Sequence, residues 1–510
     1  MFSIWQVIIY GMVFSSAMLI GYDSGYLNGV LGSSEFQHRY GVSADGGQTW
    51  YLTPRTRSLF SSLLVVGAVV GALAASVLTN RVGRKGSFLV VAIFYAVGVA
   101  VQAAGSAYAA FIMGRVFTGV GLGLVSVVTP GYLVEASSGK SRGRMIATYQ
   151  QVLTLGNIMA CAFSLGTSNL PGANNWRITV ALQLVLALIV FIGALVAPES
   201  PVMLMHWGKP EQAAKSISLL RNQTAESEEV GVAMREIREW LDEQASVGKV
   251  NIVECFEGTN LRRTLIGSAM GLMQMLTGIN FWFGYGTTFF QAAGIKNAYL
   301  VSLILALVNS VFTVPSIYLI EKIGRRACLF IGGCIMCLFQ LVTGIVHSCI
   351  PHSIASNNML IAGAVFFIAA YAGTWGPVGW TTMTEPYSAR LRTPSTSVAL
   401  VIYWVITWAV GFAVPYMVDS TAGDLGVNVA YVWVGTIAFA LMWAFFCVPE
   451  LAGLSTREVD MLFEQKIPAW RSKKWSKQLR TLNGVDATSD NSEKSVQSEA
   501  LSQKQRCKQG

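Results

Sequence analysis

Long apolar tracts, rather than alternating apolar and polar positions, dominate the chain. Eleven tracts of at least 19 residues contain no Asp, Glu, Lys or Arg: 1–22, 58–80, 86–114, 116–134, 145–176, 178–198, 264–295, 297–320, 327–384, 393–418 and 425–449. The polar turn from Pro351 to Asn358 divides the longest tract in two. Because about 20 apolar helical residues cross the hydrocarbon core of a bilayer, the pattern predicts twelve transmembrane helices in an all-α membrane protein.

The overall composition agrees with this pattern. Only 12% of the 510 residues are charged and 53% are hydrophobic, whereas about 25% of an ordinary globular chain is charged. A soluble protein of this length could not cover its surface with so few charges. We therefore exclude a soluble enzyme, a nucleic-acid-binding protein and a disulfide-stapled secreted module.

The distribution of basic residues predicts the orientation. If the N-terminus is cytosolic, most of the 36 Lys and Arg residues fall in cytosolic segments, and the outer loops hold only Arg39, Arg55, Arg57, Arg177 and Lys296. This asymmetry obeys the positive-inside rule, so we expect both termini in the cytosol. The first span, from about Gln6, has no basic region before it and no cleavage site after it, so no cleaved signal peptide is expected.

Two charged segments divide the chain into four parts. We expect an N-terminal bundle at 1–198, a cytosolic loop at 199–263, a C-terminal bundle at 264–449 and a cytosolic tail at 450–510. In the loop, Pro210–Leu220 and Ala233–Leu241 read as short amphipathic helices. In the tail, Ser455 with Glu458 resembles a capping box that opens a helix, and the polar stretch after about Arg471 is expected to be disordered.

The two predicted bundles repeat the same motifs. Arg81-Val-Gly-Arg-Lys85 follows the second span, and Lys322-Ile-Gly-Arg-Arg326 follows the eighth. Glu135 precedes Arg142 by the same spacing that separates Glu385 from Arg392. Two pseudo-symmetric six-helix bundles are therefore expected, with a cavity between them.

Further motifs lie at or near the ends of the predicted spans. They are Gly21-Tyr-Asp-Ser-Gly25, Gly114-Arg-Val-Phe-Thr-Gly-Val-Gly-Leu-Gly123, Pro130-Gly-Tyr-Leu-Val-Glu135, Pro198-Glu-Ser-Pro201, Leu276-Thr-Gly-Ile-Asn280, Trp375-Gly-Pro377 and Pro449-Glu450. Together with the repeated motifs, they resemble the sugar-porter branch of the major facilitator superfamily, and in particular its fungal hexose transporter-like members. The likeness covers about residues 6–463.

The chain departs from the family pattern at several positions. Asn80 stands where Asp is usual in the first loop motif, and Val202 replaces an Arg. Met275 replaces the second Gln of a Gln-Gln pair, Tyr403 replaces an Asn, and Ala372 sits where some members have Glu. These changes concern the identity of the substrate and not the fold. Met275 favours a substrate that is less polar or differently oriented.

The resemblance implies a set of uncharged substrate-binding side chains. Amides both donate and accept hydrogen bonds, as sugar hydroxyls do, and an indole offers a stacking face. The implied positions are Gln150, Gln274, Asn280, Asn309, Trp380 and Tyr403. The alternative for each amide is a bond between helices. Gln274 and Asn280 lie ~120° apart on a straight helix, so sharing a ligand requires a bend near Gly278, Gly284 or Gly286.

Asp23 and Arg115 are the charged pair expected inside the spans. Both fall near the outer surface, so they are close enough to pair. The resemblance implies that Asp23 carries the proton in proton-coupled members, although facilitative members also keep this Asp. The alternative is a static ion pair that holds two spans together.

Charged residues at the cytosolic span ends are expected to form a gate between the bundles. The candidates are Arg84, Glu135, Arg142, Glu321, Arg325, Glu385 and Arg392. The acidic members are the informative ones, since the positive-inside rule alone explains isolated basic residues. The glycine-rich stretches Gly67–Gly71 and Gly119–Gly123 indicate close helix packing.

These observations favour a plasma-membrane carrier for a monosaccharide or related polyol, with slight preference for proton symport. A facilitative uniporter and a sugar sensor remain as alternatives. No cofactor, metal or nucleic acid is expected, because the chain has no GxxxxGK[ST] loop and no metalloprotease or nucleophile-elbow motif. The expected partners are the sugar, protons and the lipid bilayer.

Overall fold

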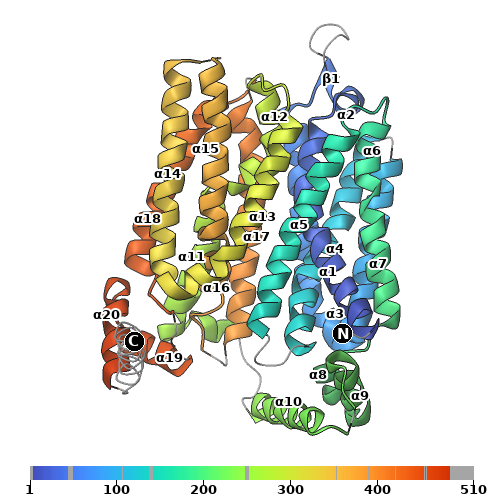
Figure 1. The fold of residues 1–510 in the computed structure, drawn as a ribbon, viewed down its shortest axis with the longest axis vertical. Helices are drawn as coiled ribbons and strands as arrows, with labels where there is room; N and C mark the ends of the chain where they lie inside the picture. Colours follow the sequence, from blue (N-terminus) through green and yellow to red (C-terminus); the bar gives the residue numbers. More distant parts are fainter. Residues whose placement is uncertain are drawn as a thin grey trace, which may run out of the picture.

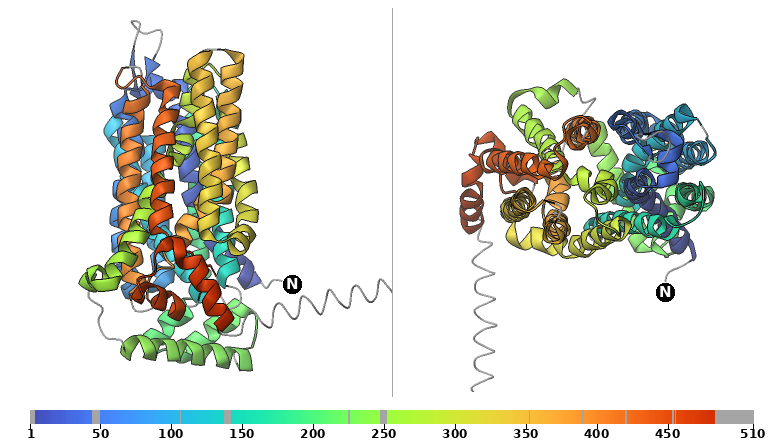
Figure 2. Two further views of the ribbon diagram at one scale, coloured as in Figure 1. Left: turned by 90° about the vertical axis from the view of Figure 1, so that its left-hand side faces the viewer. Right: turned by 90° about the horizontal axis from the view of Figure 1, so that it is seen from above.

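The computed structural model describes residues 4–43, 50–105, 107–136, 142–224, 226–246, 252–351, 353–388, 391–419, 421–452, 454 and 456–482. The described chain is almost entirely helical, and its long helices stand side by side in two groups (Figure 1). Seen along the helices, the blue-to-cyan group and the green-to-red group are neighbours (Figure 2, right). The fold is therefore the two-bundle all-α arrangement expected from the repeat.

The N-terminal bundle contains six long crossings. It is built from α1 (Ile4–Leu31), α3 (Pro54–Ala104), α4 (Tyr108–Ala136), α5 (Arg142–Thr167), α6 (Asn174–Ala181) and α7 (Gln183–Val196). Helix α3 supplies two crossings, separated at Gly83, whose φ of 76° is non-helical. This conformation favours glycine because it has no Cβ. Helices α6 and α7 together supply the last crossing.

The C-terminal bundle repeats this layout with two broken crossings. It contains α11 (Gly258–Leu276), α12 (Ile279–Ala292), α13 (Ala298–Ile323), α14 (Arg325–Cys349), α15 (Ile354–Gly373), α16 (Trp375–Thr382), α17 (Arg392–Val418), the short η2 (Gly426–Asn428) and α18 (Val429–Cys447). One break falls at Gly278, with φ 85°, where the sequence predicted a bend. The other falls at Thr374, between α15 and α16.

Ten stretches of the described helices are long and apolar enough to cross a membrane. Helix α5 and the broken α11–α12 pair are not among them. Helix α5 carries many polar side chains, and the break at Gly278 leaves two shorter helices. Polar side chains thus interrupt the apolar pattern in α5, and a break interrupts it between α11 and α12.

Close packing of α3 on α4 explains one of the glycine-rich patterns. A Cβ at Gly67 would come 2.2 Å from the carbonyl oxygen of Val116, and one at Gly119 would come 2.1 Å from that of Leu64. Real side chains do not approach backbone so closely, so these positions admit only glycine. The prediction that these glycines serve helix packing is confirmed.

Short elements cover both ends of the bundles (Figure 1). On the outer side lie α2 (Ser34–Tyr40) and an antiparallel pair, β1 (Val42–Ser43) with β2 (Trp50–Tyr51), in which Val42 faces Tyr51. At the opposite end lie α8 (Pro201–His206), α9 (Pro210–Arg221), α10 (Glu228–Ser246), η1 (Ile252–Phe256), α19 (Thr456–Glu464), η3 (Ala469–Arg471) and α20 (Ser472–Leu482). The two predicted loop helices correspond to α9 and α10.

The prediction of disorder after about Arg471 is wrong for the first part of the tail. Ser472–Leu482 forms α20, in which Ser472 and Ser476 are buried against the protein. Polar composition suggested a solvated chain, but small hydroxyl side chains pack well when they find partners. Ser455, the proposed cap of α19, and residues 483–510 lie outside the described residues.

Candidate functional site

Gln274 lies in the seam between the two broken crossings. Its side chain is 1% exposed, and its Nε2 donates to the carbonyl oxygens of Trp375 and Gly376, at 3.3 and 3.1 Å. These carbonyls lie in the first turn of α16, directly after the break. Among the described residues, no group within hydrogen-bond geometry donates to its buried Oε1 atom. In this conformation Gln274 joins two helices and keeps one unsatisfied acceptor, which is costly unless a donor arrives.

Asn280 lies on the other side of the Gly278 break. Its side chain is half-buried, and its Nδ2 lies 3.2 Å from the Sδ atom of Met275. A thioether is a weak acceptor. Met275, which departs from the family pattern, therefore contacts Asn280, which the resemblance implies in substrate binding. Met275 thus influences the orientation of the Asn280 amide.

Gln150 and Asn309 come from opposite bundles, on α5 and α13, and both are half-buried. Their neighbours in sequence join these helices: Gln151 Nε2 donates to Ser310 Oγ at 2.5 Å, and Thr154 Oγ1 lies 3.0 Å from the same oxygen. Sequence reasoning missed this polar contact. The signal was present as adjacent polar residues in the middle of apolar spans.

Trp380 and Tyr403 form an aromatic pair between α16 and α17. Their ring centroids are 5.3 Å apart at 49°, and the indole remains 38% exposed. Exposure is unusual for a tryptophan within a bundle unless its face adjoins lipid or an open space. The two residues expected to bind substrate are thus brought together as one surface.

The expected pairing of Asp23 with Arg115 is present. Arg115 Nη1 lies 2.9 Å from Asp23 Oδ1, and the side chains are 2% and 3% exposed. The same nitrogen donates to Tyr26 Oη at 2.7 Å, and Tyr26 donates to Gln102 Oε1 at 2.7 Å. The Nε atom of Arg115 donates to the carbonyl of Phe60. Tyr26 and Gln102 were not identified from the sequence, since neither belongs to the motifs.

The cytosolic charges form one cluster in each bundle. Arg84 Nη2 is 2.6 Å from Glu135 Oε1, and Arg325 Nη2 is 2.8 Å from Glu385 Oε1. In this conformation each ion pair joins elements of a single bundle. The expected gate, in which salt bridges between the bundles latch the outward-facing state, stays a prediction. The side chains of Arg142, Glu321 and Arg392 lie outside the described part of the chain.

Glu199 and Glu450 complete these clusters; both stand in the motifs of the sequence, but neither was expected to join the cytosolic charges. Glu199 accepts the backbone N–H of Arg84 at 2.8 Å, and Glu450 accepts that of Arg325 at 3.0 Å. Each carboxylate thereby caps the helix that follows a positive-φ glycine, Gly83 or Gly324. Burial raises the pKa of Glu199, and the backbone donors oppose that shift. The two bundles therefore share the same arrangement of these charged groups, as the internal repeat of the sequence predicts.

The two bundles contact each other near their outer ends. Asn28 Oδ1 accepts the backbone N–H of Thr287 at 2.8 Å, and Ser58 Oγ donates to the carbonyl of Phe412 at 2.7 Å. Tyr285 Oη contacts the hydroxyl of Ser61 and donates to the carbonyl of Gly411. An ion pair joins Arg57 to Asp419 at 3.6 Å. The outer ends of the bundles are therefore held together by polar contacts.

Comparisons with known proteins identify several similar chains. The family model described as sugar (and other) transporter matches residues 8–463. The high glucose sensor RGT2 of Saccharomyces cerevisiae is 32% identical, over 94% of this chain and 63% of that protein. The high-affinity hexose transporter HXT6 of the same yeast is 28% identical, over 93% and 85%. The partially occluded, inward-open xylose transporter XylE of E. coli has a TM-score of 0.73 at 21% identity, covering 89% of this chain and 100% of that one.

Proposed function

Because the chain belongs to the sugar (and other) transporter family, we propose that it carries a monosaccharide or a related small polyol across a membrane by alternating access. It is an integral membrane protein of a family of carriers, and not an enzyme. Relatives named as a hexose transporter and a glucose sensor favour a hexose. The charge asymmetry of the loops favours both termini in the cytosol, and the plasma membrane is the location that we propose.

The observation that carries this proposal is the group of polar side chains at the broken crossings. Gln274 keeps a buried, unpartnered Oε1 beside the first turn of α16, and Trp380 in the same helix presents an exposed indole beside Tyr403. A sugar hydroxyl can donate to such an acceptor, and a sugar ring can stack on such a face. Asn280, Gln150 and Asn309 would complete the site from α12, α5 and α13.

Proton coupling is the proposed driving force. The buried Asp23 carboxylate has Arg115 as its ionic partner, and a buried acid beside a cation changes its proton affinity when that cation moves or water enters. An Asp23 that gains a proton on the outer side and loses it on the cytosolic side would couple sugar movement to the proton gradient. Facilitated diffusion remains the alternative, with the ion pair as a static link.

The decisive experiment replaces Asp23 by Asn. We expect Asp23→Asn to abolish accumulation of radiolabelled hexose against its gradient while exchange of internal for external sugar continues. Asp424→Asn is the matched control, because Asp424 is an exposed outer carboxylate, and it should retain uphill uptake. Uphill uptake by Asp23→Asn, or a wild-type protein that only equilibrates the sugar, would exclude symport.

A sugar sensor is the second candidate function. It is favoured by the 32% identity to a protein named as a glucose sensor, although this chain spans only 63% of that protein's length. A sensor binds sugar but transports little of it. Uptake measured in cells that lack their own hexose carriers separates the two: sustained uptake supports the carrier, and binding without uptake supports the sensor.

A further inference from the structure

The C-terminal helix α20 is attached to the C-terminal bundle along one side. The Oγ atom of Ser472 accepts the backbone N–H of Glu450 at 2.8 Å and donates to the carbonyl of Ala469 at 2.6 Å. Ser476 is buried as well, and Trp475 packs on the apolar cluster that includes Leu462 and Phe463. The orientation of α20 is therefore set by the protein, and its other side faces outward.

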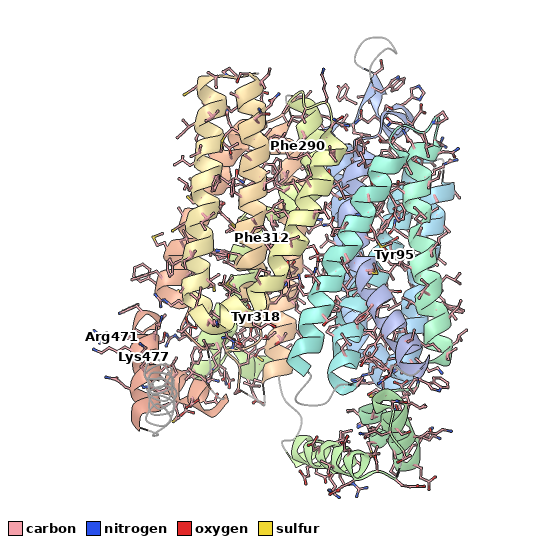
Figure 3. The ribbon with its side chains drawn as sticks, in the orientation of Figure 1. Tyr95, Phe290, Phe312, Tyr318, Arg471 and Lys477 are labelled. Carbon is pink, nitrogen blue, oxygen red and sulfur yellow. The ribbon has the colours of Figure 1, made fainter. Side chains whose placement is uncertain are left out.

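The outward side of α20 is basic. Lys473, Lys474 and Lys477 are all exposed, and Arg471 directly before the helix is exposed too. Residues three and four apart share a helix face, so these lysines form one surface. Arg471 and Lys477, which lies within α20, are found at the edge of the molecule (Figure 3). The sequence of α20, SKKWSKQLRTL, contains no acidic residue.

Exposed aromatic rings place this surface beside the lipid-facing side of the bundle. Trp470 is 50% exposed, and its ring centroid lies 6.1 Å from that of Phe446 in α18, which is 55% exposed. The guanidinium of Arg326 lies over the neighbouring Phe445 at 5.3 Å. Helix α20 lies level with the cytosolic end of α18, whereas α8–α10 extend further from the bundles (Figures 1 and 2). Aromatic and basic residues at a span end are typical of the membrane interface.

We propose that α20 and Trp470 form a binding surface for anionic phospholipid headgroups of the cytosolic leaflet. The lysine ammonium groups pair with headgroup phosphate and carboxylate oxygens, while Trp470 and Phe446 contact the upper part of the acyl chains. A basic side chain near an anionic leaflet adds attraction that a zwitterionic leaflet does not supply. This surface is independent of the sugar site, so it stands whether the chain is a carrier or a sensor.

The surface is also linked to the cytosolic cluster of the same bundle. Ser472 is bonded to the backbone of Glu450, and the Glu450 carboxylate accepts the N–H groups of Arg325 and Arg326. Arg325 in turn pairs with Glu385. A lipid held by α20 is thus attached, through a short series of hydrogen bonds, to the helix end that carries the cluster.

The test measures lipid selectivity of the purified full-length protein. Protein in detergent is mixed with equal amounts of phosphatidylserine and phosphatidylcholine, and native mass spectrometry gives the ratio of the two lipids retained. The triple variant Lys473→Gln, Lys474→Gln, Lys477→Gln should lower the retained serine-to-choline ratio by roughly tenfold. Lys474→Gln alone should lower it by less, which keeps the test available if the triple variant does not fold.

The matched control removes the same charge from the cytosolic helices α9 and α10. Lys215→Gln, Arg235→Gln, Arg238→Gln changes three exposed basic residues and should leave the lipid ratio unchanged. Trp470→Ala should reduce retention of both lipids alike. The proposal is overturned if the α20 variants retain the wild-type ratio, or if the control variant loses selectivity equally, since general positive charge would then explain the attraction.

Discussion

At the scale of single residues, neighbouring amides have different surroundings. Gln151 bonds to Ser310 across the two bundles, and Gln274 bonds to the carbonyls of Trp375 and Gly376. Gln150, one position before Gln151, is half-buried on α5 and has a side chain that points about 100° away from that of Gln151 around the helix. Gln151 therefore serves helix contact, whereas substrate binding by its neighbour Gln150 stays a prediction.

The substitutions Gln150→Ala and Gln151→Ala test this separation. Gln150→Ala should weaken sugar binding by roughly tenfold, the effect of one or two lost hydrogen bonds, with unchanged protein in the membrane. Gln151→Ala should leave sugar affinity within about twofold and lower the melting temperature, because Ser310 loses a partner. Binding is measured by isothermal titration and stability by thermal unfolding in detergent. Unchanged affinity in Gln150→Ala would assign Gln150 to packing.

At the scale of elements, the break between α11 and α12 determines how the seventh crossing presents its amides. Gly278 has φ 85°, and a Cβ there would lie 2.5 Å from the indole of Trp433. Both backbone conformation and space thus require glycine. Without the break, Gln274 and Asn280 would continue on one straight helix and point in different directions, as their spacing predicts.

Replacing Gly278 by Ala should disturb the site through the backbone. We expect Gly278→Ala to reduce the initial rate of sugar uptake by more than about tenfold and to lower the melting temperature, because left-handed backbone is unfavourable for alanine. Gly284→Ala is the control, since Gly284 lies within α12 and no atom lies within 4 Å of its added Cβ. It should keep normal uptake and unfold no earlier than the wild type. Equal losses in the two variants would contradict this account.

At the scale of the whole molecule, several polar contacts between the bundles lie near the outer end, and the contacts of Gln151 and Thr154 with Ser310 lie near the middle of the helices. The two cytosolic ion pairs stay within their bundles. The outer contacts suit a state closed to the outside. A carrier that alternates must break the outer contacts in the opposite state. Each outer contact therefore biases the equilibrium between the two states by its own free energy.

Tyr285→Phe should shift that equilibrium toward the outward-facing state. The variant removes the hydroxyl that contacts Ser61 and the Gly411 carbonyl, a loss of about 1–2 kcal/mol that corresponds to roughly five- to thirtyfold. Spin labels at Arg55 and Lys296, with the exposed cysteines replaced, should show longer outer distances. Tyr431→Phe removes a hydroxyl contact with Ser348 inside the C-terminal bundle and should leave the distances unchanged. Unaltered distances in Tyr285→Phe would exclude an outer latch at this residue.

Much of the architecture was predictable because it depends on local sequence. Apolar length predicted the crossings, and the repeated loop motifs predicted two bundles. Intramembrane charge predicted the Asp23–Arg115 pair. The prediction for the tail failed at α20, because composition does not reveal that Ser472 can bond to the distant backbone of Glu450. The gate between the bundles stays a prediction, because the ion pairs that form in the outward-facing state depend on the conformational state.

Membrane insertion, a duplicated helical bundle and a charged pair within the spans all follow from the sequence of this chain. These properties follow from the free energy of moving each segment from water into lipid, which depends on the segment alone. The partner of each polar atom, in contrast, becomes known from the folded molecule: Gln274 bonds to the first turn of α16, and Glu199 accepts the backbone N–H of Arg84. Hydrogen bonds depend on distances of a few tenths of an ångström between helices far apart in sequence, and such distances exist only in the folded molecule.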